Sequence, residues 1–217
     1  MKVRRVLSVL LLAAGMLLPG ALCRPAPALP DSPAARAIRA ALPAELDPLR
    51  RRVVEAGAAL LGRVDYFWGG KSEAVGWDRR WGTATVVDAP GSSTTGQCLP
   101  FGLDCSGFVS WCAVTAAEDP AAGAVMGSGV SGQWAACTPV DWEQAQPGDL
   151  AFFPDLSHVG VVAGPPAEGA LPVLHCSSSL GGVVCSPDAA AAGFTAIGRP
   201  EFYSFYKNAI ESDKGID

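Results

Sequence analysis

The stretch Leu103–Trp111, with the sequence LDCSGFVSW, has the residue types and spacing for covalent chemistry. Asp104 is a common helix-capping residue, and apolar residues follow it at helical spacing, which places Cys105 in the first turn of a helix. Free backbone N–H groups and the helix dipole favour a thiolate there. A buried cysteine is more often an inert apolar side chain, so this stretch alone leaves a nucleophile and a core residue as alternatives.

The two histidines of the chain, His158 and His175, both follow Cys105 in the sequence. Each lies at the end of a short apolar run that predicts a buried strand. A histidine at a strand end is more often structural than catalytic. A nucleophilic cysteine, however, needs a base, and that base needs a third group to orient it. One cysteine and two histidines supply all three parts.

Four motifs occur in the order DCSGFV, PGDLAFF, HVGVVAG and VLHCSSS. In this order they resemble the NlpC-type papain-like cell-wall cysteine peptidases. The segment YFWGG, at Tyr66–Gly70, resembles the stretch that precedes the nucleophile in that family. The resemblance extends over roughly residues 46–206, and the ordered set is far more specific than any single motif.

This resemblance implies that Cys105 is the nucleophile, His158 the general base and His175 the residue that orients His158. Tyr66 corresponds to the family tyrosine near the nucleophile. The implied fold is α+β, with N-terminal helices that carry the nucleophile packed on an antiparallel, partly barrel-like sheet. The implied reaction is hydrolysis of peptide bonds in peptidoglycan stem peptides through a thioester, often at the bond from D-glutamate to the diamino acid.

Three other functions remain open. One is a related amidase that cuts between sugar and peptide. Another is a thiol acyltransferase of the circularly permuted relatives, which the order of Cys105 before both histidines disfavours. The third is a non-catalytic wall-binding domain that has kept the fold. No C-x-x-C pair is present, so we expect neither a zinc site nor another cofactor.

The N-terminus has the pattern of a signal peptide over residues 1–28. A positive segment precedes the apolar run Val6–Leu18, and small residues offer cleavage at Ala26–Ala28 or before Cys23. Leu22 disfavours lipid attachment at Cys23, because such sites prefer a small residue there. We therefore expect an exported protein, secreted or associated with the cell wall, without a stable membrane span in the mature chain.

The remaining 189 or so residues suit one domain, and we expect a monomer. The net charge of −5 argues against a general nucleic-acid binder, and the run Arg50–Arg52 is predicted to lie on the solvated face of a helix. The predicted divisions are a Pro/Ala-rich linker at 29–45, a peptidase domain at 46–207 and a polar tail at 208–217. A short helix from Ser32 through Leu42 is the alternative to the linker.

Residues 71–102 form an insertion relative to typical members of the family. We predict that it lines the substrate cleft, with tryptophans stacking on a sugar and arginines pairing with a peptide carboxylate. An equal alternative is a surface flap whose tryptophans fill a small core of their own. The candidate substrate-binding residues are the insertion's Trp77, Arg79, Arg80 and Trp81, together with Tyr66 and Ser106 beside the nucleophile.

Seven cysteines are many for a chain of this length. Cys176 and Cys185 flank the turn at Gly181–Gly182, and we predict that they can pair in an exported protein while Cys105 stays free. Helices are predicted from Asp47 to about Gly62 and from Cys105 to about Glu118. Strands are predicted at 150–153, 158–162, 171–176, 182–185 and 197–203.

Overall fold

The computed structural model describes residues 32–167 and 169–213. The chain divides into two units, and these residues belong to the second, Asp31–Asp217. The predicted signal peptide at 1–28, including Cys23, lies outside the described residues. Within the described ranges, no helix has the length and apolar character needed to cross a membrane.

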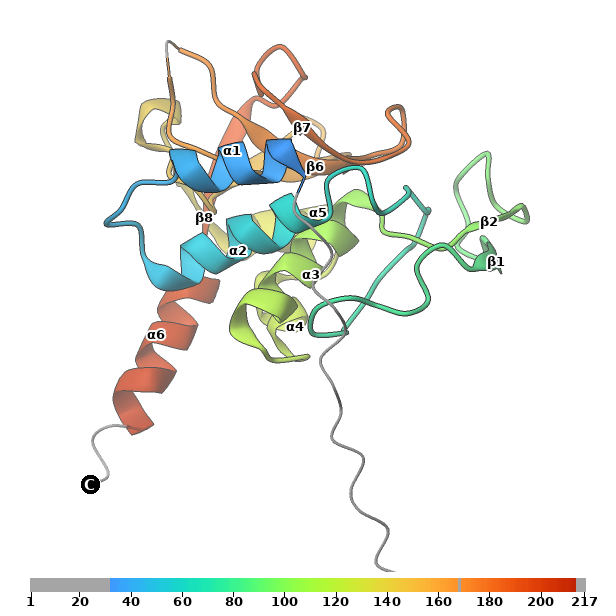
Figure 1. Ribbon diagram of the computed structural model, residues 1–217, viewed down its shortest axis with the longest axis horizontal. Coiled ribbons are helices and arrows are strands. Elements are labelled where there is room, and N and C mark those ends of the chain that lie inside the picture. The colour runs from blue at the N-terminus through green and yellow to red at the C-terminus, as the bar shows by residue number, and fades with distance from the viewer. Residues whose placement is uncertain (1–31, 168, 214–217) are drawn as a thin grey trace, which may run out of the picture. The chain divides into compact units, whose positions relative to one another are not determined.

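The first three described helices are α1 (Pro33–Ala41), α2 (Pro48–Ala59) and α3 (Cys105–Ala117) (Figure 1). Helix α1 corrects the preferred prediction of a linker at 29–45. The Ser32 hydroxyl accepts a hydrogen bond from the Ala35 N–H at 3.1 Å, so Ser32 caps the helix. Ala35 is buried, and α1 packs on α2. Burial of this apolar contact is what holds the segment in a helix.

Helix α2 packs closely against α3, the helix that carries Cys105. Asp47 caps α2 by accepting hydrogen bonds from two backbone N–H groups, as its sequence position predicts. The contact needs Gly57, because a Cβ atom at that position would lie 2.9 Å from the Phe108 ring. Helix α3 ends at Glu118 in a left-handed conformation, which confirms the predicted end of this helix.

Six strands form an antiparallel sheet in the order β3-β8-β4-β5-β6-β7. Its strands are β3 (Cys137–Val140), β4 (Leu150–Phe152), β5 (Val159–Val162), β6 (Val173–Ser177), β7 (Gly182–Ser186) and β8 (Ala196–Pro200). The α+β class is as predicted. The sheet is open, because β3 and β7 are its two edges and do not pair with each other. The short helices α4 (Ala122–Met126), α5 (Gly129–Ala135) and η1 (Trp142–Gln144) complete this part of the chain.

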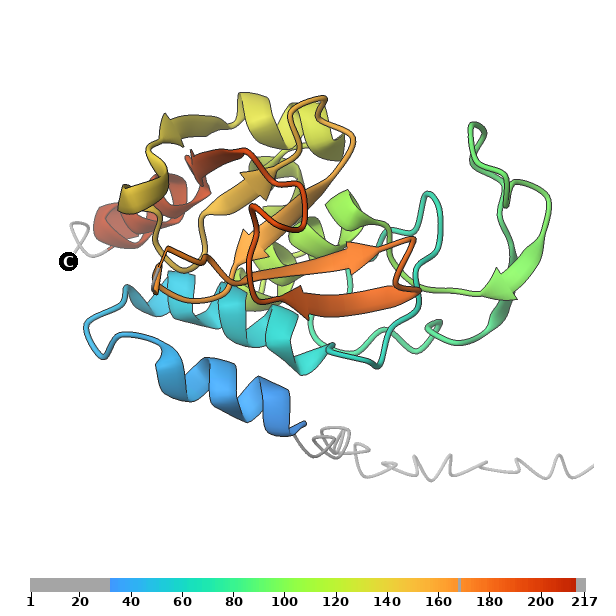
Figure 2. The same ribbon diagram turned by 90° about the horizontal axis from the view of Figure 1, so that it is seen from above.

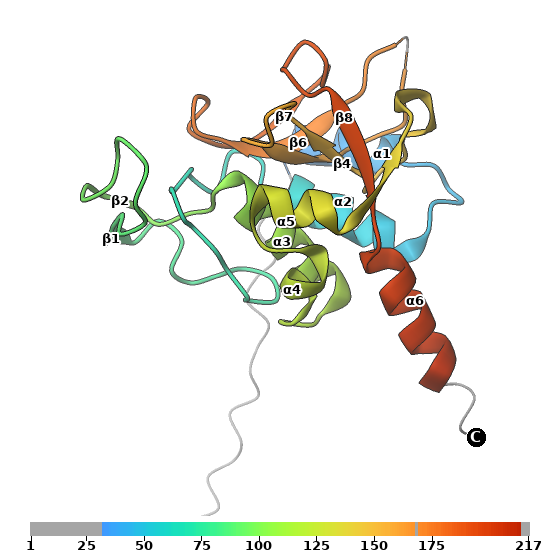
Figure 3. The same ribbon diagram turned by 180° about the vertical axis from the view of Figure 1, so that it is seen from behind.

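Both faces of the sheet are buried. Helices α2 and α3 cover one face (Figures 1 and 3). Successive residues of a strand point to opposite faces, so Val161 joins the cluster under the helices whereas Val162 joins a second cluster. That second cluster includes Phe194, from the segment between β7 and β8. This explains why the central strands are apolar along their whole length.

A buried carboxylate, Asp149, joins the helices to the sheet. Arg50 of α2 binds it at 2.8 Å and Arg199 of β8 binds it at 2.9 Å. Arg50 is only 7% exposed, so the prediction of a solvated face is wrong for this residue. A charge as buried as Asp149 requires paired cations, and Arg50 is one of them.

The C-terminal segment also differs from the prediction. The last strand ends at Pro200, and residues Phe202–Asp213 form α6 rather than the end of a strand and a polar tail. Phe202 is fully buried, and the hydroxyls of Tyr203 and Tyr206 donate hydrogen bonds to Gly148 O and Asp119 Oδ2. These anchors lie one turn apart on a helix, which explains why the polar end of the chain is helical.

The insertion at 71–102 contains a small antiparallel ribbon, β1 (Ala84–Val86) and β2 (Cys98–Pro100). The ribbon lies away from α6, at the end of the unit near the start of α3 (Figures 1 and 2). The indole N–H of Trp111, on α3, donates a hydrogen bond to Gly76 O at 2.9 Å. The N–H of Gly76 in turn donates a hydrogen bond to the Thr115 hydroxyl at 3.1 Å. The first part of the insertion is therefore fastened along α3.

Candidate active site

Cys105 is the first residue of α3, and it is 7% exposed. Asp104 caps the helix, with its Oδ1 atom 2.6 Å from the Gly107 nitrogen. The structure therefore has the cysteine in the first helical turn, as the sequence predicts. The same cap places a carboxylate directly beside the thiol.

The backbone N–H groups of Ser106 and Val159 face the Cys105 thiol and act to lower its pKa. The pKa of Cys105 is nevertheless raised, first by burial and then by the negative charge of Asp104. The two N–H groups and the ammonium of Lys71 act in the opposite direction. The helix start alone therefore does not make a resting thiolate, and a proton acceptor is needed. Val159 is the first residue of β5 and directly follows His158, so the start of the strand beside His158 faces the thiol.

The two histidine rings are in direct contact. The Nε2 atom of His158 lies 2.8 Å from Nδ1 of His175, on the neighbouring strand β6. Gly160 makes this approach possible, because a Cβ atom there would lie 3.0 Å from the His175 Cβ and 2.7 Å from Leu174 O. The rings of Phe153 and Phe194 pack against His158 at centroid distances of 5.0 and 5.5 Å. The structure thus brings together His158 and His175, the two residues that the sequence analysis predicts as general base and orienting group.

Burial lowers the pKa of both histidines to about 4, and the charge of His158 further lowers the pKa of His175. Both rings are consequently neutral near pH 7. A neutral imidazole carries one proton and one free lone pair, so it can accept a proton from a thiol. The chemistry of the pair then depends on which nitrogen holds the proton.

Ser186, which the sequence analysis did not predict as a site residue, follows His158 and His175 in this series of side-chain contacts. Its hydroxyl is 2.9 Å from Nε2 of His175. If the serine oxygen accepts from His175 Nε2–H, then His175 Nδ1 is an acceptor and His158 Nε2 must be the donor. The remaining nitrogen of His158, Nδ1, is left basic. The hairpin register indicates that Ser186 lies near His175. Val184 pairs with His175, and Ser186 is two residues after Val184 on the same face of the sheet.

Tyr66 lies where the resemblance predicts, beside the nucleophile. Its backbone forms a bridge to Leu103, and its N–H donates to Gly181 O at 3.0 Å. Burial raises the pKa of the phenol, and the charge of Cys105 raises it further. The hydroxyl therefore stays protonated and can donate a hydrogen bond near the thiol.

Ser106 is buried, and its hydroxyl belongs to the helix cap. It donates to Asp104 Oδ1 at 3.0 Å and lies 2.7 Å from the ammonium of Lys71. These contacts leave the backbone N–H of Ser106, rather than its side chain, in contact with the thiol. The cap network, including Lys71, was not recognised from the sequence.

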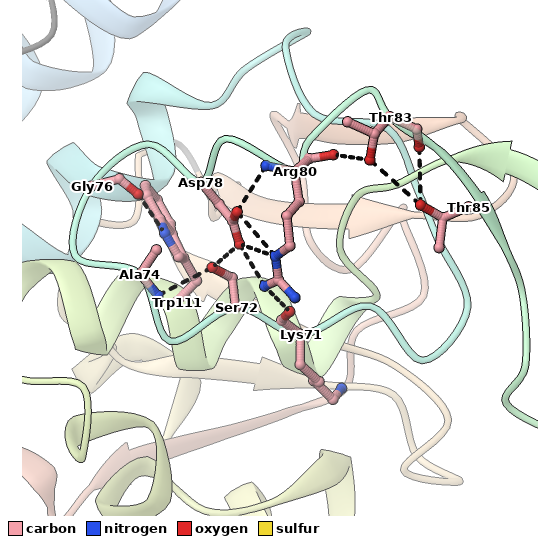
Figure 4. Close-up of polar contacts among 9 residues, drawn as sticks. All are labelled: Lys71, Ser72, Ala74, Gly76, Asp78, Arg80, Thr83, Thr85 and Trp111. Carbon is pink, nitrogen blue, oxygen red and sulfur yellow. Dashed lines mark hydrogen bonds and ion pairs between the residues drawn. The ribbon is translucent and has the colours of Figure 1, made fainter.

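The four insertion candidates divide into two kinds. Trp81 is 8% exposed and stacks edge-on with Trp77 and Trp111, so it belongs to a small core. Arg80 is held by Asp78, at 2.6 Å (Figure 4). Trp77 is 42% exposed, and Arg79 is also exposed. The structure therefore favours a self-packed flap for Trp81. Arg80 is exposed but engaged by Asp78, whereas Trp77 and Arg79 remain accessible to a substrate.

Cys176 and Cys185 do not face each other across the hairpin. Leu174 is opposite Cys185, and Val183 is opposite Cys176, so the two cysteines are diagonal neighbours. Diagonal positions are too far apart for a disulfide without a shift of the backbone. The Cys176 thiol instead contacts Leu103 O at 3.0 Å, and both cysteines are free. The predicted pairing is wrong for this register.

Comparison with solved structures finds proteins of the bacterial cell wall. RipB, a peptidoglycan hydrolase from Mycobacterium tuberculosis, is 26% identical over 74% of this chain and 69% of its own, with a TM-score of 0.48. The NlpC/p60 domain of the peptidoglycan hydrolase SagA is 20% identical over 69% of this chain and 97% of its own, with a TM-score of 0.45.

RipD from Mycobacterium tuberculosis, a non-catalytic NlpC/p60 domain protein adapted to peptidoglycan binding, is 19% identical over 70% of this chain and 98% of its own, with a TM-score of 0.47. The structural neighbours are NlpC/p60 proteins. This is the family that the ordered motifs resemble. No protein-family model matches the sequence, and none of the curated proteins matches it.

Proposed function

We propose that this protein is an exported cysteine peptidase that hydrolyses peptide bonds in peptidoglycan stem peptides. The observation that carries the proposal is the contact of the His158 and His175 rings at 2.8 Å, with Val159, the residue after His158, placed against the Cys105 thiol at the start of α3. A nucleophile at a helix start, a base and an orienting group are the parts that acyl transfer requires. The ordered motifs around these residues supply the substrate class.

The reaction begins with transfer of the Cys105 thiol proton to His158. Because Nε2 of His158 is engaged by His175, Nδ1 is the atom that takes the proton. The thiolate attacks the carbonyl carbon of the scissile bond, and a tetrahedral oxyanion forms. The backbone N–H groups at the start of α3 are the donors proposed for this oxyanion, including that of Cys105.

The protonated His158 then donates its proton to the leaving amine, and the C–N bond breaks to leave a thioester on Cys105. A water molecule gives a proton to His158 and attacks the thioester. Collapse of the second tetrahedral intermediate expels the thiolate and releases the acid. His175 keeps its bond to His158 throughout, which holds the ring in one orientation.

The bond that we propose for cleavage joins D-glutamate to the diamino acid, as the resemblance implies. The exposed residues of the insertion fit a role in substrate binding. Trp77 offers a ring to a sugar, and Arg79 offers a guanidinium to a peptide carboxylate. The ring of Trp77 rests edge-on against buried Trp81 at 4.9 Å, which supports it from behind.

Digestion of purified peptidoglycan, read by mass spectrometry, tests the proposal. We expect new stem-peptide fragments with the purified chain and none with Cys105→Ala. Cys98→Ser is the matched control, since Cys98 is exposed on β2 and should be dispensable. Release of intact stem peptides from the sugar would indicate an amidase instead. Binding to the wall without products from any variant would indicate a binding domain.

A further inference from the structure

Lys71 is the first residue of the insertion, yet its ammonium lies at the start of the nucleophile helix. Its Nζ atom is 2.7 Å from Asp104 Oδ2 and 2.7 Å from the Ser106 hydroxyl. We propose that Lys71 is a positioning residue whose charge compensates that of the capping carboxylate, so that Cys105 can ionise. This inference rests on the proposed role of Cys105 as nucleophile.

Asp104 has two opposing effects at this site. As a cap it binds the Gly107 N–H at 2.6 Å and thereby fixes the first turn of α3. As a negative charge it raises the pKa of Cys105 and of Tyr66. A cation that binds the carboxylate removes most of the second effect and leaves the first intact. Lys71 is placed to do this, and its charge lowers the pKa of the thiol.

The chain is built to bring Lys71 to this place. Asp104 N–H donates to Gly70 O at 3.2 Å, which holds the segment before Lys71 against the helix. A Cβ atom at Gly107 would lie 2.1 Å from Gly70 O and 3.1 Å from the Lys71 Cδ atom. Glycine at position 107 is therefore what allows the Lys71 side chain to cross the first turn of α3.

The insertion holds the backbone of Lys71 from the other side. The Arg80 guanidinium donates to Lys71 O at 3.3 Å while it binds Asp78, and Asp78 also accepts from Ser72 at 2.7 Å. Figure 4 shows this cluster around the Lys71 carbonyl, with the Lys71 side chain extending away from it. Arg80 therefore acts as a brace for Lys71 rather than as a free cation for substrate.

The titratable groups that face the thiol come from several elements. Asp104 and Lys71 lie at the helix start, Tyr66 lies in the preceding loop, and Cys176 lies on β6. His158 lies beside Val159, whose N–H meets the thiol. Tyr66 and Cys176 are neutral near pH 7, because their pKa values are raised. Lys71 is thus the cation on this side of the thiol.

The test measures the pH dependence of Cys105 alkylation by iodoacetamide in the full chain, followed on the Cys105 peptide by mass spectrometry. We expect Lys71→Met to raise the midpoint by about 0.5–1 pH unit, which slows alkylation roughly 3- to 10-fold below the midpoint. Lys71→Arg should keep the wild-type profile. Lys207→Met, which removes an exposed lysine from α6, is the matched control and should also keep it.

A double-mutant cycle separates charge compensation from a structural role. Asp104→Asn keeps a capping oxygen but removes the charge, so Lys71→Met should cause no further rise of the midpoint in that background. Superimposable profiles for wild type and Lys71→Met overturn the inference, as does an equal shift in both backgrounds. Undiminished release of stem-peptide fragments by Cys105→Ala overturns the nucleophile role itself. Thermal unfolding of each variant confirms that the folded state is measured.

Discussion

At the candidate site, the start of α3 and the strand ends that carry the histidines differ in the charged groups that surround their reactive side chains. At the start of α3, Cys105 lies among an ion pair and backbone N–H groups. Just before β5 and on β6, the two histidines lie among aromatic rings and a serine hydroxyl, without a described ion pair. Burial raises the pKa of the thiol and lowers the pKa of both rings to about 4. Each region thus favours its neutral form.

This difference assigns separate tasks to the two regions. The helix start can adjust charge, because Lys71 and the N–H groups stabilise an anion on Cys105. The strands can fix the orientation of the His158 ring, because His158 is bonded to His175; Ser186 selects the tautomer with a basic Nδ1 on His158 if its oxygen accepts from His175. Ionisation is then a proton transfer between two buried partners rather than the loss of a proton to water. Variants in each region should change different observables.

The largest expected effect separates the two histidines. His158→Gln removes the proton acceptor, and we expect kcat/KM on stem peptides to fall by about 10³-fold. His175→Gln keeps a polar partner for His158, and we expect a loss of roughly 10- to 100-fold. Steady-state kinetics on a defined stem peptide would measure both. Equal losses, or the larger loss at His175, would contradict the proposed order of roles.

The strand region should also make stability depend on pH. Because the folded pKa values are about 4 and the ordinary pKa of histidine is 6.5, the unfolded chain binds more protons between these values. Stability is then complete above pH 6.5 and falls as the pH drops toward 4. We expect each histidine to contribute about 2 kcal/mol of this loss between pH 7 and pH 4.5, or about 4–5 kcal/mol for the pair, a decrease of roughly 10 degrees in Tm.

Thermal unfolding at the two pH values checks this expectation. The His158→Gln, His175→Gln double variant is the control and should lose most of the difference. The Asp78 carboxyl, whose pKa is lowered to about 2 by its hydrogen bonds to Arg80, titrates below this window. A double variant with an undiminished pH dependence would show that other groups cause it.

A smaller effect is expected at Ser186. Ser186→Ala removes the acceptor for His175 Nε2–H, and loss of one hydrogen bond of about 1 kcal/mol predicts a fall of roughly 5-fold in kcat/KM. Ser186→Thr keeps the hydroxyl and should stay near wild type. Nitrogen chemical shifts of His175 report its tautomer directly. An unchanged tautomer in Ser186→Ala would remove Ser186 from the site.

The smallest expected effect concerns the insertion. Arg79→Ala should raise KM about 3-fold with kcat unchanged, because an exposed charged contact contributes about 1 kcal/mol or less. Arg80→Ala should leave KM nearly unchanged but raise the midpoint of Cys105 alkylation, since Arg80 holds the backbone of Lys71. If neither variant changes KM, the insertion does not bind a substrate carboxylate.

Local signals predicted much of this molecule. Caps at Asp47 and Asp104, apolar periodicity and turn residues placed α2, α3 and four of the sheet strands within a few residues of their bounds. The errors arose where distant residues decide. Helix α1 depends on burial against α2, α6 depends on tyrosines that reach Gly148 and Asp119, and Arg50 depends on Asp149, ninety-nine residues away.

The sequence by itself predicted Cys105, His158 and His175 as the candidate site, because the prediction depends on residue types, their order and their flanking motifs, which are local features of the chain. Only the tertiary structure decided which atoms meet. The hairpin register made Ser186 a diagonal neighbour of His175 on one face and Cys185 a diagonal neighbour of Cys176 on the other. The path of the insertion carried Lys71 across the first turn of α3. Register and chain path depend on long-range packing, which residue types and spacing do not encode one segment at a time.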